Sequence, residues 1–261
     1  MRLSDITPMI LTANCDANLA ACLSDLGFAE RIVAIDSGST DQTLAICAAN
    51  PKVEVIYRKF DHHAAQRSFG IAQVPSGWVI CLDSDYRLTP EFLRELSLLP
   101  EQDENSGYFA EFGYCIFGKP LRASLLPGRV LLARANELRV ESDGHAERFG
   151  VSGSVGNLRE RILHDDRKPL ERWLPRQIFY ARMEAKKLTT TPNTELRWQD
   201  RVRKKIVLAP LLIIPYAVLI KGLWREGWRG YFYLVERVIA ELIISLAVLE
   251  LRYFSDSGKP Q

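Results

Sequence analysis

The sequence has few cysteines and no closely spaced cysteine pair. The chain has five of them, Cys15, Cys22, Cys47, Cys81 and Cys115, and no two form a Cys-x-x-Cys motif. An odd number of scattered cysteines builds neither a disulfide framework nor a typical structural zinc site. We therefore expect reduced, mostly buried thiols in a protein of the cytosolic side.

A strong charge imbalance is also missing. The formal net charge of the 261-residue chain is +2, and 25% of its residues are charged. This balance argues against a general nucleic-acid-binding role. The first residues, MRLSDITPMILTAN, contain no long apolar segment and no cleavage site, so we expect no signal peptide. The length suits one large domain with or without an appendage.

Strand-like and helix-like segments alternate over the first hundred residues. Strands are expected at 6–13, 31–37, 52–57 and 78–83, and helices at 17–26, 40–50 and 64–74. The second helix has a Ser39/Thr40 cap with Asp41 in its first turn. This order predicts βαβ units and an α/β fold with a mostly parallel sheet. The less regular residues 101–165 predict a smaller mixed or antiparallel section.

Two carboxylates follow the apolar run at 78–82. Trp78, Val79, Ile80, Cys81 and Leu82 are typical of a central strand covered on both faces. Asp83 and Asp85 then lie at the carboxyl end of the sheet, where α/β proteins bind ligands. Like charges this close oppose each other, and a divalent cation such as Mg²⁺ or Mn²⁺ removes the conflict. The alternative is a strand-end turn with solvated acids.

A second polar loop follows the strand at 31–37. Asp36 closes an apolar run, and Ser37, Gly38, Ser39 and Thr40 come next. Glycine permits a tight turn or close approach of a ligand to the backbone. Asp36 can accept hydrogen bonds from a base or a ribose. The alternative is an ordinary capped βα loop.

The combined motifs resemble the family 2 inverting glycosyltransferases, which have the GT-A fold. LTAN at 11–14 is similar to the family's T-Y-N-E, with Thr12 and Asn14 matching and Ala13 and Cys15 departing. DSGSTDQT at 36–43 is close to D-x-G-S-x-D-x-T. QRSFG at 66–70 resembles R-N-x-G, with serine at 68, and a strand and a D-x-D motif follow it. Bacterial enzymes of lipopolysaccharide core or other envelope glycan synthesis are the most similar members.

The resemblance implies roles for the matching residues. Thr12, Asn14 and Asp36 would bind the base of a nucleotide-sugar donor, together with the loop residues Ser37 and Gly38. Arg67 would contact the nucleotide or its phosphates. The donor-binding set continues with Asp83 and Ser84. Asp85 would be the main ligand of a divalent cation, Mg²⁺ or Mn²⁺, that neutralises the leaving diphosphate, with Asp83 beside it. For Arg67 the alternative is a surface salt bridge.

Inverting transfer also requires a general base. VESDGHAERFG at 140–150 offers Asp143, His145 and Glu147 in a segment too polar for a core. We favour Asp143, with Glu147 as the alternative base and His145 orienting the base or contacting the acceptor. Many relatives have His-Glu adjacent, whereas this chain reads His-Ala-Glu. An exposed acidic turn is the competing interpretation.

RILHDDRKPLERW at 161–173 is the last dense polar cluster. His164 follows an apolar pair and can complete the metal shell. Asp165 and Asp166 are interpreted as acids near a helix N-terminus, because Pro169 can begin a helix. A helix is expected from 168, with a break at Pro175.

The remaining sequence is helical. We expect a GT-A catalytic domain at 1–185, a helical region at 186–254 and a flexible tail at 255–261. Residues 206–220 are uncharged but too short to span a bilayer, and Glu236, Arg237, Glu241 and Glu250 interrupt the apolar stretch at 231–251. Aromatic residues crowd the linker between them, namely Trp224, Trp228, Tyr231 and Tyr233. This pattern predicts a peripheral, monotopic region on the cytoplasmic face of the inner membrane. The alternatives are a helical hairpin that forms an oligomer interface and true spanning helices.

The favoured function is metal-assisted sugar transfer from a nucleotide-diphosphate sugar to a lipid-linked glycan acceptor. A sugar nucleotidyltransferase is the second interpretation, but TANCDANLAACL at 12–23 lacks the Gly-rich basic loop of that class. A non-catalytic membrane-associated scaffold is the third. The intact Asp83/Asp85 pair argues against it.

Overall fold

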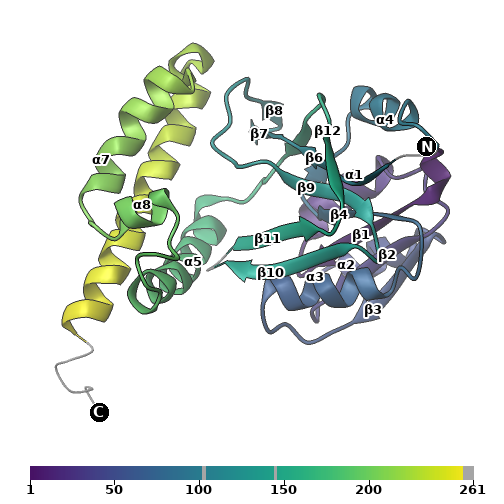
Figure 1. Ribbon diagram of the computed structural model, residues 1–261, viewed down its shortest axis with the longest axis horizontal. Helices are drawn as coiled ribbons and strands as arrows, with labels where there is room; N and C mark the ends of the chain where they lie inside the picture. Colours follow the sequence, from purple (N-terminus) through teal and green to yellow (C-terminus); the bar gives the residue numbers. More distant parts are fainter. Residues whose placement is uncertain (102–103, 144–145, 255–261) are drawn as a thin grey trace. The chain divides into compact units, whose positions relative to one another are not determined.

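The computed structural model describes residues 1–101, 104–143 and 146–254 (Figure 1). The strands are β1 (Ile6–Thr12), β2 (Ile32–Asp36), β3 (Val53–Tyr57), β4 (Trp78–Asp83), β5 (Tyr86–Arg87), β6 (Asn105–Ala110), β7 (Phe112–Ile116), β8 (Lys119–Pro120), β9 (Arg129–Arg134), β10 (Leu138–Asp143), β11 (Ala146–Val151), β12 (Ser154–Asn157) and β13 (Ile162–His164). The helices are η1 (Leu3–Asp5), α1 (Asp16–Ser24), α2 (Thr43–Ala48), α3 (His63–Ala72), α4 (Pro90–Ser97), α5 (Leu170–Thr190), α6 (Trp198–Arg203), α7 (Leu208–Pro215), η2 (Tyr216–Ile220), η3 (Leu223–Glu226) and α8 (Trp228–Tyr253).

A seven-stranded sheet in the order β12-β6-β9-β4-β1-β2-β3 forms the centre of the first compact unit. Strands β4, β1, β2 and β3 pair in parallel, as do β12 and β6. Strand β9 runs antiparallel to both of its neighbours. The predicted α/β class with a mostly parallel sheet is confirmed. The predicted separate section at 101–165 is only partly present, because β6, β9 and β12 join the central sheet. The other described strands of this range belong to two smaller sheets, β5-β13-β7-β8 and β10-β11.

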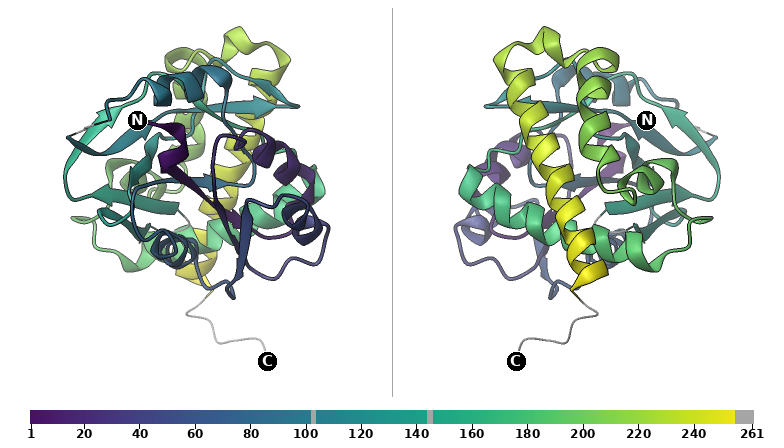
Figure 2. Two further views of the ribbon diagram at one scale, coloured as in Figure 1. Left: turned by 90° about the vertical axis from the view of Figure 1, so that its right-hand side faces the viewer. Right: turned by 90° about the vertical axis from the view of Figure 1, so that its left-hand side faces the viewer.

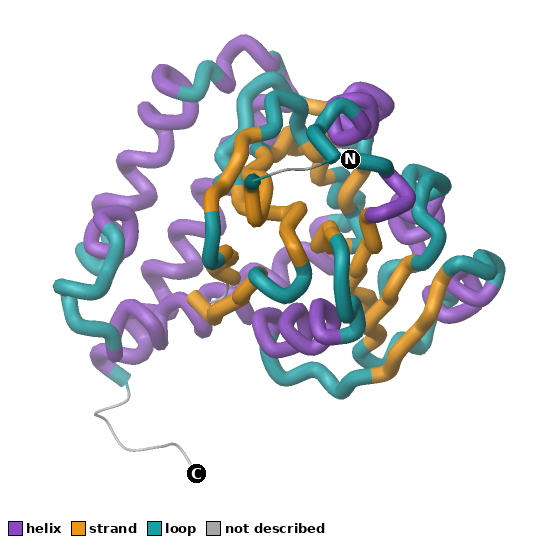
Figure 3. Tube along the Cα trace, turned by 45° about the vertical axis from the view of Figure 1, so that its right-hand side comes forward, coloured by secondary structure: helices purple, strands orange, loops and turns teal. Residues whose placement is uncertain are grey.

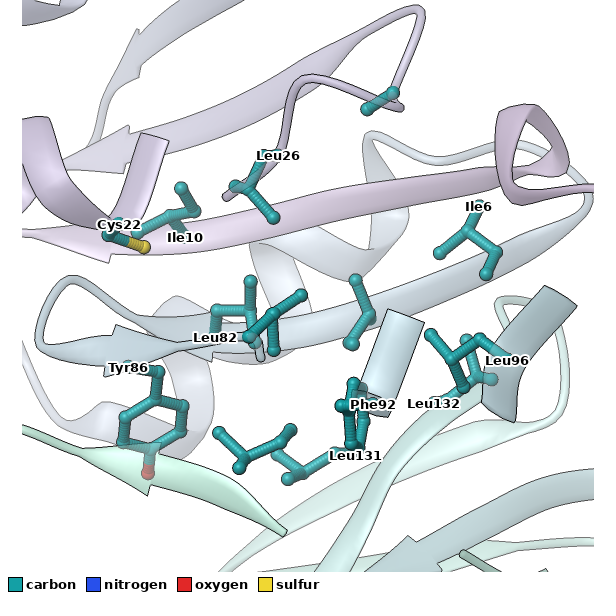
Figure 4. Packing of buried hydrophobic residues seen from close by; sticks show 14 of the residues in the cluster. Ile6, Ile10, Cys22, Leu26, Leu82, Tyr86, Phe92, Leu96, Leu131 and Leu132 are labelled. Carbon is teal, nitrogen blue, oxygen red and sulfur yellow. The ribbon is translucent and has the colours of Figure 1, made fainter. Parts of the chain in front are cut away.

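Successive residues of the central strands point to opposite faces of this sheet. Ile10, Ile80 and Leu82 join one buried cluster, to which α1, α2 and α4 contribute (Figure 4). Met9 and Cys81 join a second cluster on the other face, to which α3 contributes. Strands covered on both faces need apolar residues at every position, which explains the continuous apolar runs in the sequence. Helices flank the orange strands of this unit in Figure 3.

The helix α2 begins later than the sequence suggests. Its first residue is Thr43, so Ser39, Thr40 and Asp41 precede it. Asp41 Oδ1 accepts a hydrogen bond from the Thr43 backbone N–H at 2.9 Å. The expected Ser39/Thr40 cap is therefore wrong. Asp41 instead accepts a hydrogen bond from a backbone N–H group at the start of the helix, which has no partner within the helix. Ser39 and Thr40 therefore lie in the loop after β2.

Contacts divide the chain into two compact units. The first contains Met1–Pro120, Leu126–Ser142 and Glu147–Arg167, and the second contains Leu121–Leu125, Asp143–Ala146 and the chain from Lys168. The sequence-based division at 185/186 falls inside α5, which runs unbroken from Leu170 to Thr190. The expected break at Pro175 is wrong. Proline there removes only the hydrogen bond that a backbone N–H at 175 would donate to the Glu171 carbonyl, and its fixed φ suits a helix.

Helices make up most of the second unit. Ala181, Ala185 and Leu188 of α5 pack against Ile244 and Val248 of α8. Figure 2 shows the yellow α8 with the green α7 alongside it. None of the helices in the described part of the chain combines the length and the apolar character needed to cross a membrane. The predicted tail at 255–261 lies outside the described residues.

Close approach of α3 to the sheet requires glycine at position 70. A Cβ atom there would lie 2.6 Å from Met9 Sδ and 2.9 Å from Ile35 Cγ1, and both side chains are fully buried. The glycine of the QRSFG segment therefore has a packing role. It lets α3, which carries Gln66 and Arg67, lie directly on β1 and β2.

We predict that Gly70→Ala destabilises the protein by about 1–2 kcal/mol. Overpacking costs about 1–3 kcal/mol, and the better helix propensity of alanine recovers up to about 1 kcal/mol. Urea unfolding measures the difference. Gly27→Ala is the matched control, because a Cβ at Gly27 meets no atom within 4 Å. Equal stability of the two variants would contradict the packing role.

Candidate active site

Three parallel strands bring polar side chains to one edge of the central sheet. Thr12 of β1 is in register with Asp36 of β2, and Leu11 is in register with Asp83 of β4. Neighbouring strands are about 4.8 Å apart, so Asp36 and Asp83 lie about 10 Å apart on either side of β1. The strand order therefore brings Thr12, Asp36 and Asp83 to the same edge of the sheet, as the sequence predicts.

Asp36 is the centre of the loop that follows β2. Its Oδ1 accepts hydrogen bonds from the backbone N–H groups of Gly38 at 2.8 Å and Ser39 at 2.9 Å. Its Oδ2 accepts from the hydroxyl groups of Ser39 at 2.6 Å and Thr12 at 3.0 Å. Gly38 has a φ of 96°, a conformation that glycine adopts without steric cost.

These hydrogen bonds set the charge state of the buried Asp36 carboxyl. Burial raises its pKa, but the hydrogen bonds from Ser39, Gly38 and Thr12 outweigh burial and lower the pKa below the usual value. A carboxylate has about four acceptor positions. The four hydrogen bonds from Gly38, Ser39 and Thr12 occupy all of these positions. Asp36 therefore stabilises the conformation of the loop, where the sequence predicts recognition of the nucleotide base.

The neighbouring predicted donor-binding residues support the same loop. The Asn14 side chain accepts a hydrogen bond from the Thr40 backbone N–H at 2.8 Å, and the Asn14 backbone N–H donates to Ser39 Oγ at 2.9 Å. Asn14 has a φ of 47°, which asparagine tolerates better than most residues. Ser37 Oγ accepts from Gln66 Nε2 of α3 at 2.7 Å.

Arg67 is buried within the first unit. The side chain is 1% exposed and forms a bidentate ion pair with Glu147, with distances of 3.1 Å from Nε and 3.0 Å from Nη2. Nη2 also donates to Asp83 Oδ1 at 2.6 Å, and Nη1 donates to the Leu82 carbonyl at 3.0 Å. All of these hydrogen bonds go to protein atoms. The surface salt bridge that was the alternative for Arg67 is wrong, because the pair is buried, and its predicted contact with nucleotide stays a prediction.

A second arginine completes this group of charges. Arg129 of β9 contacts Glu147 Oε2 at 3.3 Å, Asp83 Oδ2 at 3.2 Å and the Tyr86 hydroxyl group. Its guanidinium carbon also lies 4.9 Å from the ring centre of Phe149. Two arginines thus face two carboxylates, so the group is neutral overall. We call Arg67, Asp83, Arg129 and Glu147 the charge quartet.

The quartet determines the ionisation of Asp83. Burial raises the pKa of this carboxyl, but Arg67 and Arg129 outweigh burial and hold the pKa well below its usual range. The pKa of Arg67 rises well above its ordinary value despite burial, because Glu147 and Asp83 stabilise its charge. Both Asp83 oxygens bind guanidinium groups, so the described contacts of Asp83 differ from those of a metal ligand.

Asp85 has different neighbours from Asp83. It lies in the turn between β4 and β5, and β5 pairs antiparallel with β13, which places Tyr86 opposite His164. Asp85 Oδ2 is 3.4 Å from His164 Nε2. The Asp166 carboxylate lies close by, and one ligand atom from each of Asp85, His164 and Asp166 falls within 4.8 Å of the others. The tyrosine rings of Tyr86 and Tyr114 flank the imidazole.

This cluster suits a divalent cation. In an octahedral centre with bonds of about 2.1 Å, opposite ligand atoms are about 4.2 Å apart. Two carboxylates and one imidazole make a hard to borderline donor set, which suits Mn²⁺ or Mg²⁺. The structure therefore brings together the predicted metal residues Asp85 and His164. It adds Asp166, which the sequence interpretation did not favour, and pairs Asp83 with arginines.

The candidates for the general base lie in different surroundings. Glu147 faces the two arginines of the quartet and is 5% exposed. Asp143 belongs to the second unit, where it pairs with Lys187 Nζ at 2.7 Å and with Arg197 Nη2 at 3.1 Å. His145 lies outside the described residues. Each assignment of the base therefore stays a prediction.

Ser84 lies beside Cys15, one of the positions that depart from the family motif. Burial raises the pKa of the Cys15 thiol, and hydrogen bonds with the hydroxyl groups of Ser84 and Thr43 oppose that rise. The predicted contact between Ser84 and the donor stays a prediction. Cys15 remains a protonated thiol at neutral pH.

Sequence reasoning missed two residues of this region. Arg129 lies in the apolar segment RVLLAR and gave no local signal, because its partners are distant in sequence. Asp166 comes two residues after His164 in HDD, and this spacing could have identified it. The antiparallel pairing of β5 with β13 is the step that joins Asp166 to Asp85, and no short pattern predicts that pairing.

Comparison with known families agrees with this geometry. Residues 9–160 match the model of glycosyl transferase family 2. This chain belongs to that family. The match covers β1 to β12 and includes the Asp36 loop, the charge quartet and Asp85. The chain is thus a glycosyltransferase, and the predicted GT-A class and enzyme type are confirmed.

The glycosyltransferase also resembles individual proteins. It is 27% identical over 241 residues to the lipopolysaccharide core biosynthesis glycosyltransferase LpsC of Rhizobium meliloti, covering 87% of this chain and 85% of the relative. It is 22% identical to an uncharacterized glycosyltransferase of Rickettsia felis, covering 70% of each.

Two solved structures are similar at lower identity. Glucosyl-3-phosphoglycerate synthase from Mycobacterium tuberculosis, in complex with Mn²⁺, uridine diphosphate and phosphoglyceric acid, aligns with a TM-score of 0.48 and 16% identity. That alignment covers 72% of this chain and 80% of the synthase chain. TarS of S. aureus aligns with a TM-score of 0.47 and 13% identity over 98% of this chain and 93% of its own.

We predict that Glu147→Gln destabilises this glycosyltransferase by about 3–5 kcal/mol. The change removes one carboxylate from a buried ion-pair group and leaves two guanidinium groups facing Asp83 alone. Chemical denaturation measures the loss. Glu54→Gln is the control, because its pair with Arg31 has side chains that are 51% and 40% exposed. Its effect should stay below about 1 kcal/mol.

Activity measurements separate this structural role from a catalytic one. A Glu147→Gln protein with unchanged stability and unchanged donor affinity, but with a large loss of kcat, would contradict the quartet assignment. That result would support Glu147 as the base.

Proposed function

We propose that this glycosyltransferase is an inverting enzyme that transfers a sugar from a nucleotide-diphosphate sugar to a hydroxyl group of an envelope glycan. The observation that carries the proposal is the cluster of Asp85, His164 and Asp166 at the carboxyl edge of the sheet. The Asp36 loop lies at the same edge, two strands away from Asp83. This spacing suits a ligand with a base at one end and a diphosphate at the other.

Asp85, His164 and Asp166 would hold a divalent cation. Such a cation, when bound, neutralises the charge that develops on the departing diphosphate. The protein itself contributes orientation. Pairing of β5 with β13 fixes His164 beside Asp85, and the Asp165 backbone N–H donates to the Asp85 carbonyl at 2.9 Å. Backbone hydrogen bonds thus help to fix the positions of the proposed metal ligands Asp85 and His164.

Donor recognition would involve the Asp36 loop. Thr12, Asn14 and the loop residues present a rigid edge built by internal hydrogen bonds. Ser39 and Thr12 each donate a hydroxyl hydrogen to Asp36. A hydroxyl group rotates easily, so a base N–H can replace either donor without movement of the backbone. This exchange is compatible with the predicted role of Asp36.

The acceptor class rests on similarity to LpsC, whose name assigns it to lipopolysaccharide core synthesis. We propose a hydroxyl group of a lipid-linked glycan as the acceptor. Inversion requires a single displacement, in which one base removes the hydroxyl proton as the nucleotide diphosphate leaves.

Binding of nucleotide with metal tests the donor site. We expect uridine, guanosine, cytidine or adenosine diphosphate to raise the melting temperature in the presence of Mn²⁺, with one base preferred. A ligand at a hundred times its Kd adds about 2.7 kcal/mol of stability. Asp85→Asn and His164→Ala should abolish the Mn²⁺-dependent part of the shift. Glu160→Gln, an exposed acid, is the control. A shift that survives both site variants would refute the metal assignment.

We propose Asp143 as the general base, as the sequence predicts. Arg197, one of the two cations that pair with Asp143, is 54% exposed, whereas the arginines that face Glu147 are 1% and 20% exposed. Asp143→Asn should lower kcat by about 10²- to 10⁴-fold and leave the nucleotide-dependent thermal shift intact. Arg197→Gln is the matched control, since it removes one ion-pair partner of Asp143 and keeps the carboxylate. Equal losses of stability and of transfer in both variants would show that Asp143 is structural.

A further inference from the structure

The helix α7 and the π-helix η2 expose an apolar surface within the second unit. Every exposed side chain from 208 to 220 is aliphatic, proline or tyrosine. Leu219 and Ile220 are each 74% exposed, and Leu211 is 59% exposed. The full set is Leu208, Leu211, Leu212, Ile214, Pro215, Tyr216, Leu219 and Ile220. We call these residues the α7–η2 face.

The α7–η2 face has no charged residue, although charged residues lie at both of its ends. The uncharged run extends from Ile206 to Ile220, between Lys205 and Lys221. Single exposed leucines are ordinary, but a continuous apolar surface of this kind marks a binding site. A soluble helix normally places polar residues on its solvent side. In this segment, charged residues occur only beyond the two ends, at Lys205 and Lys221.

The turn that follows η2 adds aromatic rings and positive charge. Trp224 is 63% exposed and Trp228 is 62% exposed. Lys221 Nζ lies 5.8 Å from the ring centre of Tyr216, and the Arg225 guanidinium lies 5.0 Å from that of Trp224. Tryptophan and tyrosine rings with nearby cations are typical of the interface between lipid headgroups and acyl chains.

The acidic residue of this turn is directed into the protein. Glu226 Oε1 accepts hydrogen bonds from the backbone N–H groups of Arg122 at 3.0 Å and Ala123 at 3.3 Å, within the same unit. Lys205, Lys221 and Arg225 are exposed. The charge next to the apolar surface is therefore positive, which complements an anionic surface.

We propose that the α7–η2 face lies in the interface of an anionic lipid bilayer, with the aromatic-basic turn at the headgroups. The 13 residues from 208 to 220 rise about 20 Å as helix, less than the roughly 30 Å of a hydrocarbon core. The face therefore lies on the membrane. This proposal is independent of the sugar-transfer reaction, since none of its residues belongs to the metal cluster or the Asp36 loop.

The structure indicates which part of the predicted membrane-surface region at 186–254 makes this contact. The second apolar stretch, at 231–251, carries an apolar stripe at helical spacing, made up of Val235, Val238, Ile239, Leu242, Leu246 and Leu249. Only Val235, Leu242 and Leu246 of that stripe are exposed. Tyr233 is 1% exposed, so it does not belong to the aromatic cluster at the surface. By contrast, eight of the 13 residues from 208 to 220 are exposed.

Vesicle co-sedimentation of the full chain tests the proposal. We expect binding to phosphatidylcholine vesicles that contain phosphatidylglycerol, much weaker binding to phosphatidylcholine alone, and a decrease with salt. Leu211→Glu combined with Leu219→Glu should weaken binding about tenfold or more. Lys221→Gln combined with Arg225→Gln should weaken binding to anionic vesicles by about tenfold and leave binding to neutral vesicles unchanged.

The control places the same substitution on another exposed leucine. Leu98 follows α4 in the first unit and is 78% exposed, so Leu98→Glu should bind vesicles like the unchanged protein. All variants should keep their melting temperature and their Mn²⁺-dependent nucleotide shift, which separates failure of this proposal from failure of the sugar-transfer proposal.

Two results would overturn the lipid assignment. One is vesicle binding that Leu211→Glu with Leu219→Glu leaves unchanged. The other is a dimer in lipid-free light scattering that these glutamates dissociate, together with no vesicle binding. In that case a second copy of the chain covers the α7–η2 face.

Discussion

Charge balance between Arg67, Asp83, Arg129 and Glu147 is the constraint on which the catalytic unit depends. Each ion would be costly to bury alone, and each is stabilised by two neighbours of opposite sign. The four residues come from α3, β4, β9 and β11, so the quartet ties segments distant in sequence to the end of β4. It fixes the strand whose next turn carries Asp85.

The two acids of the D-x-D motif therefore have separate functions. Asp83 points into the arginines and holds the strand end in place. Asp85, two residues later, lies with His164 and Asp166. Alternation along an extended chain sends residues of this spacing to the same side, but the turn after β4 breaks that rule. A rigid, charge-compensated support beneath the side chains of Asp85, His164 and Asp166 suits the metal site proposed above.

Sequence reasoning reached the parallel sheet and the Asp36 loop, since both depend on local patterns at strand ends. It placed His164 with Asp85 from the chemistry of histidine as a metal ligand and from the family resemblance. It could not reach Arg129, whose neighbours are set by antiparallel pairing of β9. Arg67 shows the same limit, because its position in QRSFG carries no information on burial. Apolar periodicity identified the helix at α8, but tertiary packing decided which of its side chains are buried and left most residues of α7 and η2 exposed.

The saturated carboxylate of Asp36 has a consequence for how tightly any partner can bind there. A bound group can form a hydrogen bond with Asp36 only by replacing one of the internal hydrogen bonds. The exchange is therefore close to neutral in free energy. Discrimination between ligands then comes from the shape of the ligand and from the direction of the carboxylate lone pairs, and the exchange adds little to the binding affinity. If a nucleotide base binds at Asp36 as proposed, such a site would distinguish one base from another and still release the nucleotide quickly.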